Sequence, residues 1–120
     1  MTIMKDIDWV DKKTLAEYLD VSVRSVERFQ TLGLPHRKND DKPYKVGFCI
    51  HWYIGYTESK PYGLKQKDGL TLTLFGYAIA DLNGAQLQNK GLEIAKLTGH
   101  SPFDIGIAIG ILKQGNLVRS

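Results

Sequence analysis

Two short helices joined by only three residues are predicted near the N-terminus, and this spacing constrains the fold more than any other feature of the chain. Leu15, Ala16 and Leu19 form a compact apolar stripe along the first helix. Asp11 or Thr14 can cap its N-terminus. Two helices joined this closely define a helix-turn-helix unit.

The second helix has clear start and stop signals. Residues 20–22 break the apolar period, and the hydroxyl of Ser22 can accept a backbone N–H of the next helix. Gly33 is expected to end that helix in the left-handed region, and Pro35 prevents its continuation. Its buried side is expected to consist of three apolar residues at helical spacing: Val26, Phe29 and Leu32.

The outer face of the second helix is basic and polar. Arg24 and Arg28 lie one turn apart, so their guanidinium groups project side by side. Guanidinium groups bind guanine edges or phosphates, so this face is a candidate DNA-recognition surface, with a merely solvated face as the alternative. The candidate DNA-facing residues of this helix and its cap are Ser22, Arg24, Ser25, Glu27, Arg28 and Thr31.

A basic hairpin is predicted directly after the second helix. Residues 36–38 and 44–46 are its expected arms, and residues 39–43 contain the Asn, Asp and Pro that favour a turn. Basic side chains on both arms suit contacts with phosphates, which position a protein on DNA without recognising its sequence. The candidate phosphate-binding residues are Lys12, Lys13, Arg37, Lys38, Lys42 and Lys45.

A third helix is predicted from Gly47 to about Thr57, packed across the first two by its aromatic and aliphatic residues. Short motifs accompany these elements: K-x-L-A from Lys13, V-S-x-R-S-V from Val21, an aromatic at Phe29, G-L-P from Gly33, Tyr44, and I-x-W-Y from Ile50. Over about residues 11–55, under half of the chain, they resemble the excisionase and MerR-type winged helix-turn-helix family, most closely the DNA-binding domain of the lambda-type phage terminase small subunit. The resemblance implies that the second helix lies in the major groove and that the hairpin is a wing on the backbone or minor groove.

The C-terminal half is predicted to be a second unit that follows a linker at residues 57–69. Residues 70–82 favour a helix, with a strand as the alternative for their start, and residues 83–84 favour a turn. Residues 92–97 form the next predicted helix, and residues 98–100 the turn after it.

The last predicted helix has three start signals: a Ser101 cap, Pro102 at its first position and an acidic Asp104. It is expected to stop at residues 115–116, before a short strand at residues 117–118. This half therefore resembles a second helix-turn-helix core without a visible wing.

The last helix is apolar around its circumference and carries no Lys or Arg before Lys113. Glycines four residues apart permit close approach of another backbone, so a self-association or partner-binding face is the favoured interpretation. A second DNA-recognition helix and a purely structural core are the alternatives. The candidate oligomerisation residues are Phe103, Gly106, Ile107, Gly110 and Ile111.

The charge distribution favours the N-terminal half as the DNA-binding half. Residues 1–67 hold twelve Lys and Arg against nine Asp and Glu, whereas residues 68–120 hold four of each. A local basic excess is what a DNA footprint requires, although ordinary surface charge is the alternative.

Other residues argue against catalysis, metal binding and cofactors. Cys49 is the only cysteine, which excludes an intramolecular disulfide and favours a reducing compartment. His36, His51 and His100 lie far apart without metal-ligand spacing. No phosphate-binding glycine loop, nucleophile motif or paired carboxylates are recognisable. No signal peptide or apolar run of about 18 residues is present, so we expect a cytoplasmic protein that does not bind membranes.

The sequence therefore predicts a mainly α fold with a small β-wing, organised as tandem winged helix-turn-helix-like domains. The expected units are residues 1–56, the linker 57–69, and residues 70–120. The expected function is sequence-specific binding of double-stranded DNA by a homo-oligomeric regulator or architectural factor of a phage or mobile element, with another protein of that element as a further partner. The alternative is a terminase small subunit that recognises a packaging site, although the C-terminal half lacks the long heptad helices of a ring-forming core.

Overall fold

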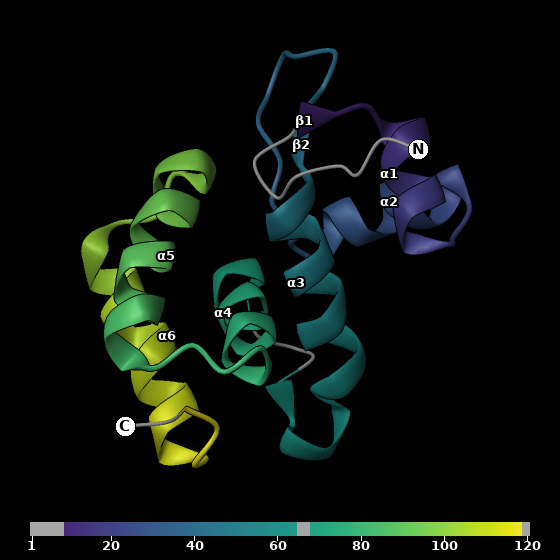
Figure 1. The fold of residues 1–120 in the computed structure, drawn as a ribbon. Helices are drawn as coiled ribbons and strands as arrows, with labels where there is room; N and C mark the ends of the chain where they lie inside the picture. Colours follow the sequence, from purple (N-terminus) through teal and green to yellow (C-terminus); the bar gives the residue numbers. More distant parts are fainter. Residues whose placement is uncertain (1–8, 65–67, 119–120) are drawn as a thin grey trace.

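The computed structural model describes residues 9–64 and 68–118, which form six α-helices and a small two-stranded antiparallel sheet (Figure 1). The elements in chain order are β1 (Trp9–Val10), α1 (Lys12–Leu19), α2 (Val23–Thr31), β2 (Tyr44–Lys45), α3 (Val46–Glu58), the 3-10 helix η1 (Lys60–Tyr62), α4 (Gly69–Ile79), α5 (Gly84–Thr98) and α6 (Pro102–Gln114). The predicted mainly helical fold with a small β component is confirmed.

Local capping bonds start α1 and α2 where the sequence predicted. The Asp11 carboxylate accepts the Thr14 backbone N–H at 2.8 Å, and the Ser22 hydroxyl oxygen accepts that of Ser25 at 3.0 Å. Asp20 adopts a left-handed conformation (φ 56°) at the end of α1. The helix-stop prediction at Gly33 is confirmed, because this residue has φ 107°.

The predicted burial of Leu32 is wrong. This side chain is 39% exposed, and Leu34, only 1% exposed, occupies the core instead. The reason is the left-handed turn at Gly33, which brings the Leu34 N–H within 3.0 Å of the Phe29 carbonyl oxygen. The chain thereby reverses and returns Leu34 to the buried side.

The predicted hairpin between residues 36–38 and 44–46 is also wrong. β2 pairs with β1, with Trp9 opposite Lys45 and Val10 opposite Tyr44, and residues 36–43 form a loop without strands. The Arg37 N–H donates to the Pro43 carbonyl at 2.9 Å and closes this loop at its base. The extended segment before α1 thus replaces the expected first arm.

Helices α3 and α4 cross in close backbone contact. A Cβ atom on Gly55 would overlap the Leu72 carbonyl oxygen, and one on Gly76 would overlap the His51 carbonyl oxygen. Beside this crossing the rings of His51 and Tyr77 stack with centroids 3.7 Å apart. The segments predicted as separate units therefore share one continuous hydrophobic core.

The segment predicted as a linker, residues 57–69, contributes Leu64 to that core, and its residues 65–67 lie outside the described residues. Residues up to Glu58 belong to α3, Gly69 belongs to α4, and η1 lies between them. Ser59 and Leu64 are buried. The Ser59 hydroxyl donates to the Tyr56 carbonyl at 2.8 Å, which fixes the start of η1 against the end of α3.

The start of α5 was predicted too late. Asn83 accepts the Gln86 N–H and the Gln86 side chain accepts the Asn83 N–H, so a capping box begins a helix where a turn was expected. The start of α6 follows the prediction, because Ser101 and Asp104 form a second capping box with Pro102 at the first turn. The strand expected at residues 117–118 does not form.

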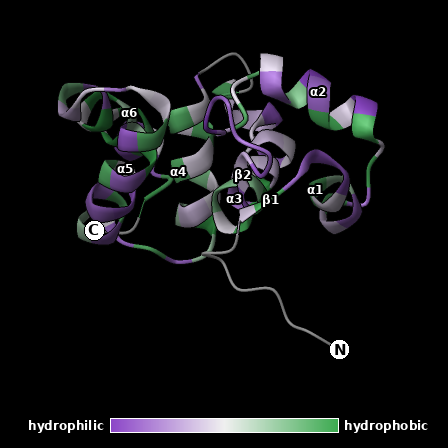
Figure 2. Cartoon of the chain, turned by 90° about the horizontal axis from the view of Figure 1, so that it is seen from above, coloured by the Kyte–Doolittle hydropathy of each residue, from purple (hydrophilic) through white to green (hydrophobic). Residues whose placement is uncertain are grey.

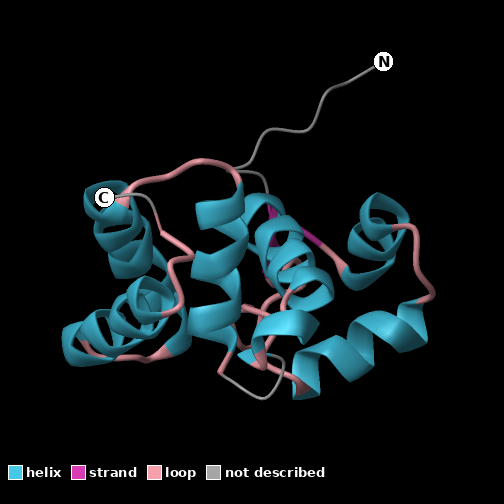
Figure 3. Cartoon of the chain, turned by 90° about the horizontal axis from the view of Figure 1, so that it is seen from below, coloured by secondary structure: helices cyan, strands magenta, loops and turns pink. Residues whose placement is uncertain are grey.

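The helices lie in a consistent order across the molecule. α1 and α2 occupy one end, α5 and α6 the other, and α3 and α4 lie between them (Figures 1 and 2). The view from below shows the same arrangement, with the two short strands beside the central helices (Figure 3). Within the described ranges, no helix is long and apolar enough to cross a membrane.

Candidate nucleic-acid interface

The outer face of α2 is opposite its buried face. Val26 and Phe29 are buried in the core. Arg24, Arg28 and Thr31 are exposed on the other side of the helix. The Arg28 guanidinium carbon lies 5.5 Å from the Phe29 ring centroid, and Arg24 forms no ion pair with any residue that the structure describes. The two guanidinium groups are therefore available to an external anion or base edge.

An ion pair joins α1 to the side of this face. The Lys12 ammonium lies 2.9 Å from a Glu27 carboxylate oxygen. Because both side chains are substantially exposed, the pair adds little to stability. The ion pair nevertheless partly neutralises Glu27, the only carboxylate on the exposed face of α2. This weakens the repulsion between Glu27 and a polyanion.

The two predicted serine contacts belong to the N-terminal cap of α2. The hydroxyl oxygens of Ser22 and Ser25 lie 3.0 Å apart, and Ser22 also accepts the Ser25 N–H. Ser22 is exposed and Ser25 is half-buried. Their first role is therefore to orient the helix start on which Arg24 lies.

The loop at residues 36–43 is locally organised. The Arg37 guanidinium carbon lies 3.8 Å from the Trp9 ring centroid, and its Nε lies 3.2 Å from an Asp40 carboxylate oxygen. Asn39 adopts a left-handed conformation (φ 56°), and Asp40 accepts the Lys42 N–H at 2.8 Å. Lys38 and Lys42 are exposed on this loop.

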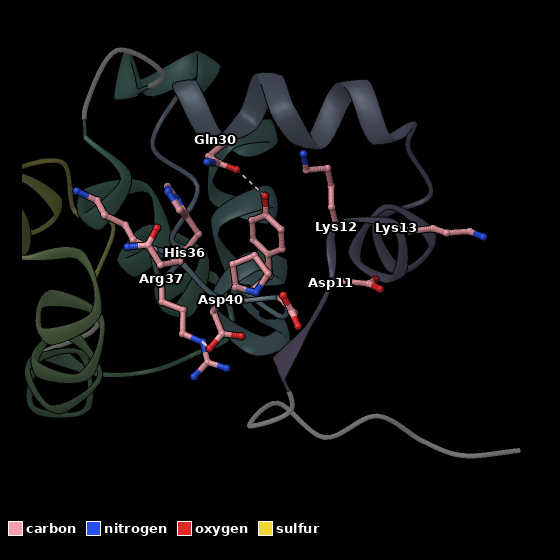
Figure 4. A pocket seen from close by; sticks show the side chains of 12 residues that line it. Asp11, Lys12, Lys13, Gln30, His36, Arg37 and Asp40 are labelled. Atoms are coloured by element: carbon pink, nitrogen blue, oxygen red, sulfur yellow. Dashed lines mark hydrogen bonds and ion pairs between the residues drawn. The ribbon is translucent and has the colours of Figure 1, made fainter.

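An open cavity of about 600 Å³ lies between this loop and the starts of α1 and β2 (Figure 4). Lys12 and Lys13 line it from α1, and Arg37 and Lys38 from the loop. The Lys12 side chain extends toward α2, whereas that of Lys13 projects outward from α1 (Figure 4). The structure thus brings four predicted phosphate-binding residues around one concave surface, here called the wing cavity.

Lys45 lies apart from the residues that line the wing cavity. Its side chain is half-buried, and its ammonium nitrogen lies 4.8 Å from the Phe48 ring centroid. Alternation along β2 places its neighbour Tyr44 in the core and toward the cavity instead. Lys45 is therefore engaged in a contact within the protein and does not line the wing cavity.

Sequence reasoning missed Trp9, Gln30 and His36. Trp9 supports Arg37 from β1, and the Gln30 amide oxygen accepts a 2.6 Å bond from the Tyr44 hydroxyl (Figure 4). His36 lines the wing cavity, and its Nδ1 lies 2.9 Å from the Leu34 carbonyl oxygen. The aromatic and β-branched pair at residues 9–10 was the available signal for β1; the other contacts have no local signal.

Burial controls the protonation of two groups in this region. Burial raises the pKa of Tyr44 to about 12, with smaller contributions from Cys49 and Glu27, so its hydroxyl keeps the proton that Gln30 accepts. Burial also raises the pKa of the Cys49 thiol, which lies 3.5 Å from the Pro35 carbonyl oxygen. A buried, neutral thiol is a poor nucleophile.

The predicted oligomerisation residues lie on α6, at the other end of the molecule. Phe103 is 75% exposed and Ile107 is 49% exposed. A Cβ atom on Gly106 or Gly110 would meet no atom within 4 Å, whereas Ile111 is half-buried against the core. Phe103, Gly106, Ile107 and Gly110 therefore form one uncovered strip, here called the α6 face.

Within the described ranges, no three or more His, Cys, Asp or Glu residues are grouped so that they could hold a metal ion. No protein-family model matches the chain, and no curated protein matches it.

Proposed function

We propose that this chain is a sequence-specific double-stranded DNA-binding protein that inserts α2 into the major groove. The observation that carries the proposal is the pair of exposed arginines, Arg24 and Arg28, one turn apart on the face opposite Val26 and Phe29. A rigid helix that presents two guanidinium groups suits bidentate contacts with guanine. Thr31 extends the same face toward the end of the helix.

The loop at residues 36–43 acts as a wing on the phosphate backbone. Lys12, Lys13, Arg37 and Lys38 surround the wing cavity, and Lys42 is exposed beside them. Backbone contacts of this kind set the orientation of a recognition helix without recognising bases. In this interpretation β1, β2 and the loop form the wing of the first of two helix-turn-helix units, and α5 and α6 form the second.

The α6 face joins two copies of the chain. Phe103 and Ile107 supply apolar area, and Gly106 and Gly110 leave room for a partner backbone. A single small helix-turn-helix contacts few base pairs, so two linked copies bind two half-sites with much higher affinity.

The biological role we favour is a regulator or architectural factor of a phage or mobile element, based on the motif resemblance between residues 11 and 55. The longest helix within the described ranges is α5, with 15 residues. This length offers little support for the long helices of a ring-forming packaging protein, the alternative role.

Selection of bound duplexes from a randomised pool, followed by fluorescence anisotropy on the enriched site, tests the proposal. Arg24→Ala and Arg28→Ala should each weaken binding to that site, whereas Lys113→Ala on α6 should not. Failure to enrich any sequence would contradict sequence-specific recognition.

A further inference from the structure

A second cavity, of about 680 Å³, lies between the N-terminal helix-turn-helix and the C-terminal helices. Its walls are the C-terminal end of α2 with the following loop on one side, and the C-terminal end of α5 with its turn on the other. The N-terminus of α4 lies at its base. We call it the interhelix cavity. Its volume falls within the range typical of small-molecule sites, and such sites often lie where two structural units meet.

Two of the segments that line the interhelix cavity are in close backbone contact. Gly33 and Gly69 both line it, and a Cβ atom on Gly69 would overlap the Gly33 carbonyl oxygen. The two segments therefore already touch and cannot move closer. Gly33 is also held in the left-handed region (φ 107°), which fixes the path of the chain into the loop.

The lining of the interhelix cavity combines an apolar floor with a cationic rim. Leu34 and Leu70 are buried below it, and Leu97 is half-buried beside them. Arg37, Lys38 and Lys96 line it, and Asp68 is the one acidic residue among the lining.

The Asp68 carboxylate caps the start of α4. One of its oxygens accepts the Thr71 backbone N–H at 2.8 Å and the Thr71 hydroxyl at 3.0 Å. Because three cationic residues line the cavity against this one carboxylate, the lining favours a negatively charged ligand.

Two histidines add hydrogen-bonding capacity at the edges. The Nδ1 of His36 lies 2.9 Å from the Leu34 carbonyl oxygen, so it donates and leaves Nε2 as the second ring nitrogen. The Thr98 hydroxyl donates to the Ile94 carbonyl at 2.9 Å, so its oxygen accepts from the Nδ1 of His100, 2.6 Å away. The Nε2 atoms of both imidazoles thus take no part in these local hydrogen bonds.

We propose that the interhelix cavity binds a small organic anion with an apolar body. The apolar body covers the leucine floor, and the anionic group lies among Arg37, Lys38 and Lys96. A DNA backbone would use the cations but not the apolar floor, which is why a small ligand fits the lining better.

Occupancy of the cavity is coupled to DNA binding, a step that rests on the proposed function. His36, Arg37 and Lys38 line both the interhelix cavity and the wing cavity. A ligand that engages Arg37 competes with its contacts to Trp9 and Asp40, which hold the loop in place. Ligand binding then changes the position of the same cations that contact phosphate.

The test uses the full-length chain and two matched probes. 1-Anilinonaphthalene-8-sulfonate carries rings and an anionic group, and N-phenyl-1-naphthylamine carries the same rings without it. Glycine amide signals in ¹H–¹⁵N NMR spectra report the location, because Gly33, Gly69 and Gly99 line the interhelix cavity. Gly106 and Gly110 mark the α6 face, another apolar surface where such a probe could bind.

We expect the sulfonate to shift the cavity glycines and to bind more tightly than the neutral probe. Lys96→Glu should weaken binding of the sulfonate about fivefold or more, since an attraction between charges becomes a repulsion. Lys113→Glu is the matched control, because both lysines are exposed in the last turn of a helix. Shifts confined to Gly106 and Gly110, equal binding of both probes, or equal effects of the two variants would overturn the site.

Anisotropy with the selected duplex tests the coupling separately. At one sub-saturating probe concentration, the sulfonate should change the DNA dissociation constant of the wild type more than that of Lys96→Glu. An unchanged constant at saturating probe would overturn the coupling. A third outcome is that DNA shifts the amide signals of the cavity glycines and that Lys96→Glu weakens the binding of DNA but not of the sulfonate. The cavity would then be a DNA contact, and the proposal would be wrong. If no duplex is selected, the proposed function is wrong. The probe experiment still shows whether the interhelix cavity binds an organic anion.

Discussion

The Tyr44 hydroxyl donates a 2.6 Å hydrogen bond to the Gln30 amide oxygen, and this bond ties β2 to the last turn of α2. Tyr44 is 1% exposed, so its ring is part of the core while its hydroxyl reaches the edge of the wing cavity. The proposed recognition helix α2 and the proposed wing are therefore connected through one pair of side chains.

Tyr44→Phe should remove this bond and lower the free energy of unfolding by about 0.5–1.5 kcal/mol. Gln30 is exposed and can bond to water instead, which keeps the loss within this range. Urea denaturation measures the change, and Tyr18→Phe at an exposed site is the control. A loss no larger than that of the control would mean that the bond contributes nothing.

The pH dependence of stability should also report Tyr44. Because burial raises its folded-state pKa to about 12 from an ordinary 10.0, its contribution is fully present below pH 10. Between pH 10 and 12 the unfolded chain loses this proton and the folded chain does not, so stability falls as pH rises. Wild type should lose more stability than Tyr44→Phe across this interval, and parallel curves would contradict the assignment.

The α3–α4 crossing should be intolerant of any side chain at Gly76. Gly76→Ala forces a Cβ atom into the His51 backbone, and overpacking of this kind typically costs about 1–3 kcal/mol or more. Gly84→Ala at the start of α5 is the matched control, since the atoms nearest its Cβ position lie 3.5 Å away at the flexible end of Lys113. That control should leave stability unchanged or raise it by up to about 1 kcal/mol. Thermal or urea unfolding of the two variants gives the comparison, and similar effects would contradict the crossing.

The loop lysines should act on all DNA sequences alike. Replacing Lys38 or Lys42 with Gln should flatten the slope of log K against log salt by roughly one unit per lost phosphate contact. Titrations at several salt concentrations, on specific and random duplexes, make the measurement, with Lys113→Gln as control. A loss restricted to one sequence at unchanged slope would mean that these lysines do not contact phosphates.

The α6 face should control assembly. Ile107→Asp places a charge among Phe103, Gly106 and Gly110 and should shift the protein toward monomer in sedimentation experiments. The N-terminal helices should stay folded, and DNA affinity should fall because two linked contacts become one. A variant that keeps the wild-type assembly state but loses DNA binding would instead place α6 on the DNA.

Helix starts and stops were predictable because their signals are local. Ser22, Gly33 and Ser101 act through bonds that span three or four residues, and the structure contains them where the sequence placed them. Asn83 carried the same kind of signal, but its capping box was interpreted as a turn.

Contacts between distant segments were not predictable in the same way. The pairing of β1 with β2 and the crossing at Gly55 and Gly76 depend on how separate elements meet, which no short window encodes. At the candidate site, the exposure of Arg24 and Arg28 follows from helical period alone. The stacking of Arg37 on Trp9 depends on the unexpected strand pair.

The most direct test is the affinity of single arginine variants for the selected duplex, measured by anisotropy at one salt concentration. Arg24→Ala and Arg28→Ala should each cost about 1–3 kcal/mol on the selected site, with a much smaller loss on random duplex. Lys113→Ala should match wild type on both, and circular dichroism should show all three variants folded. Unchanged affinity of both arginine variants for the selected site would remove α2 from DNA recognition.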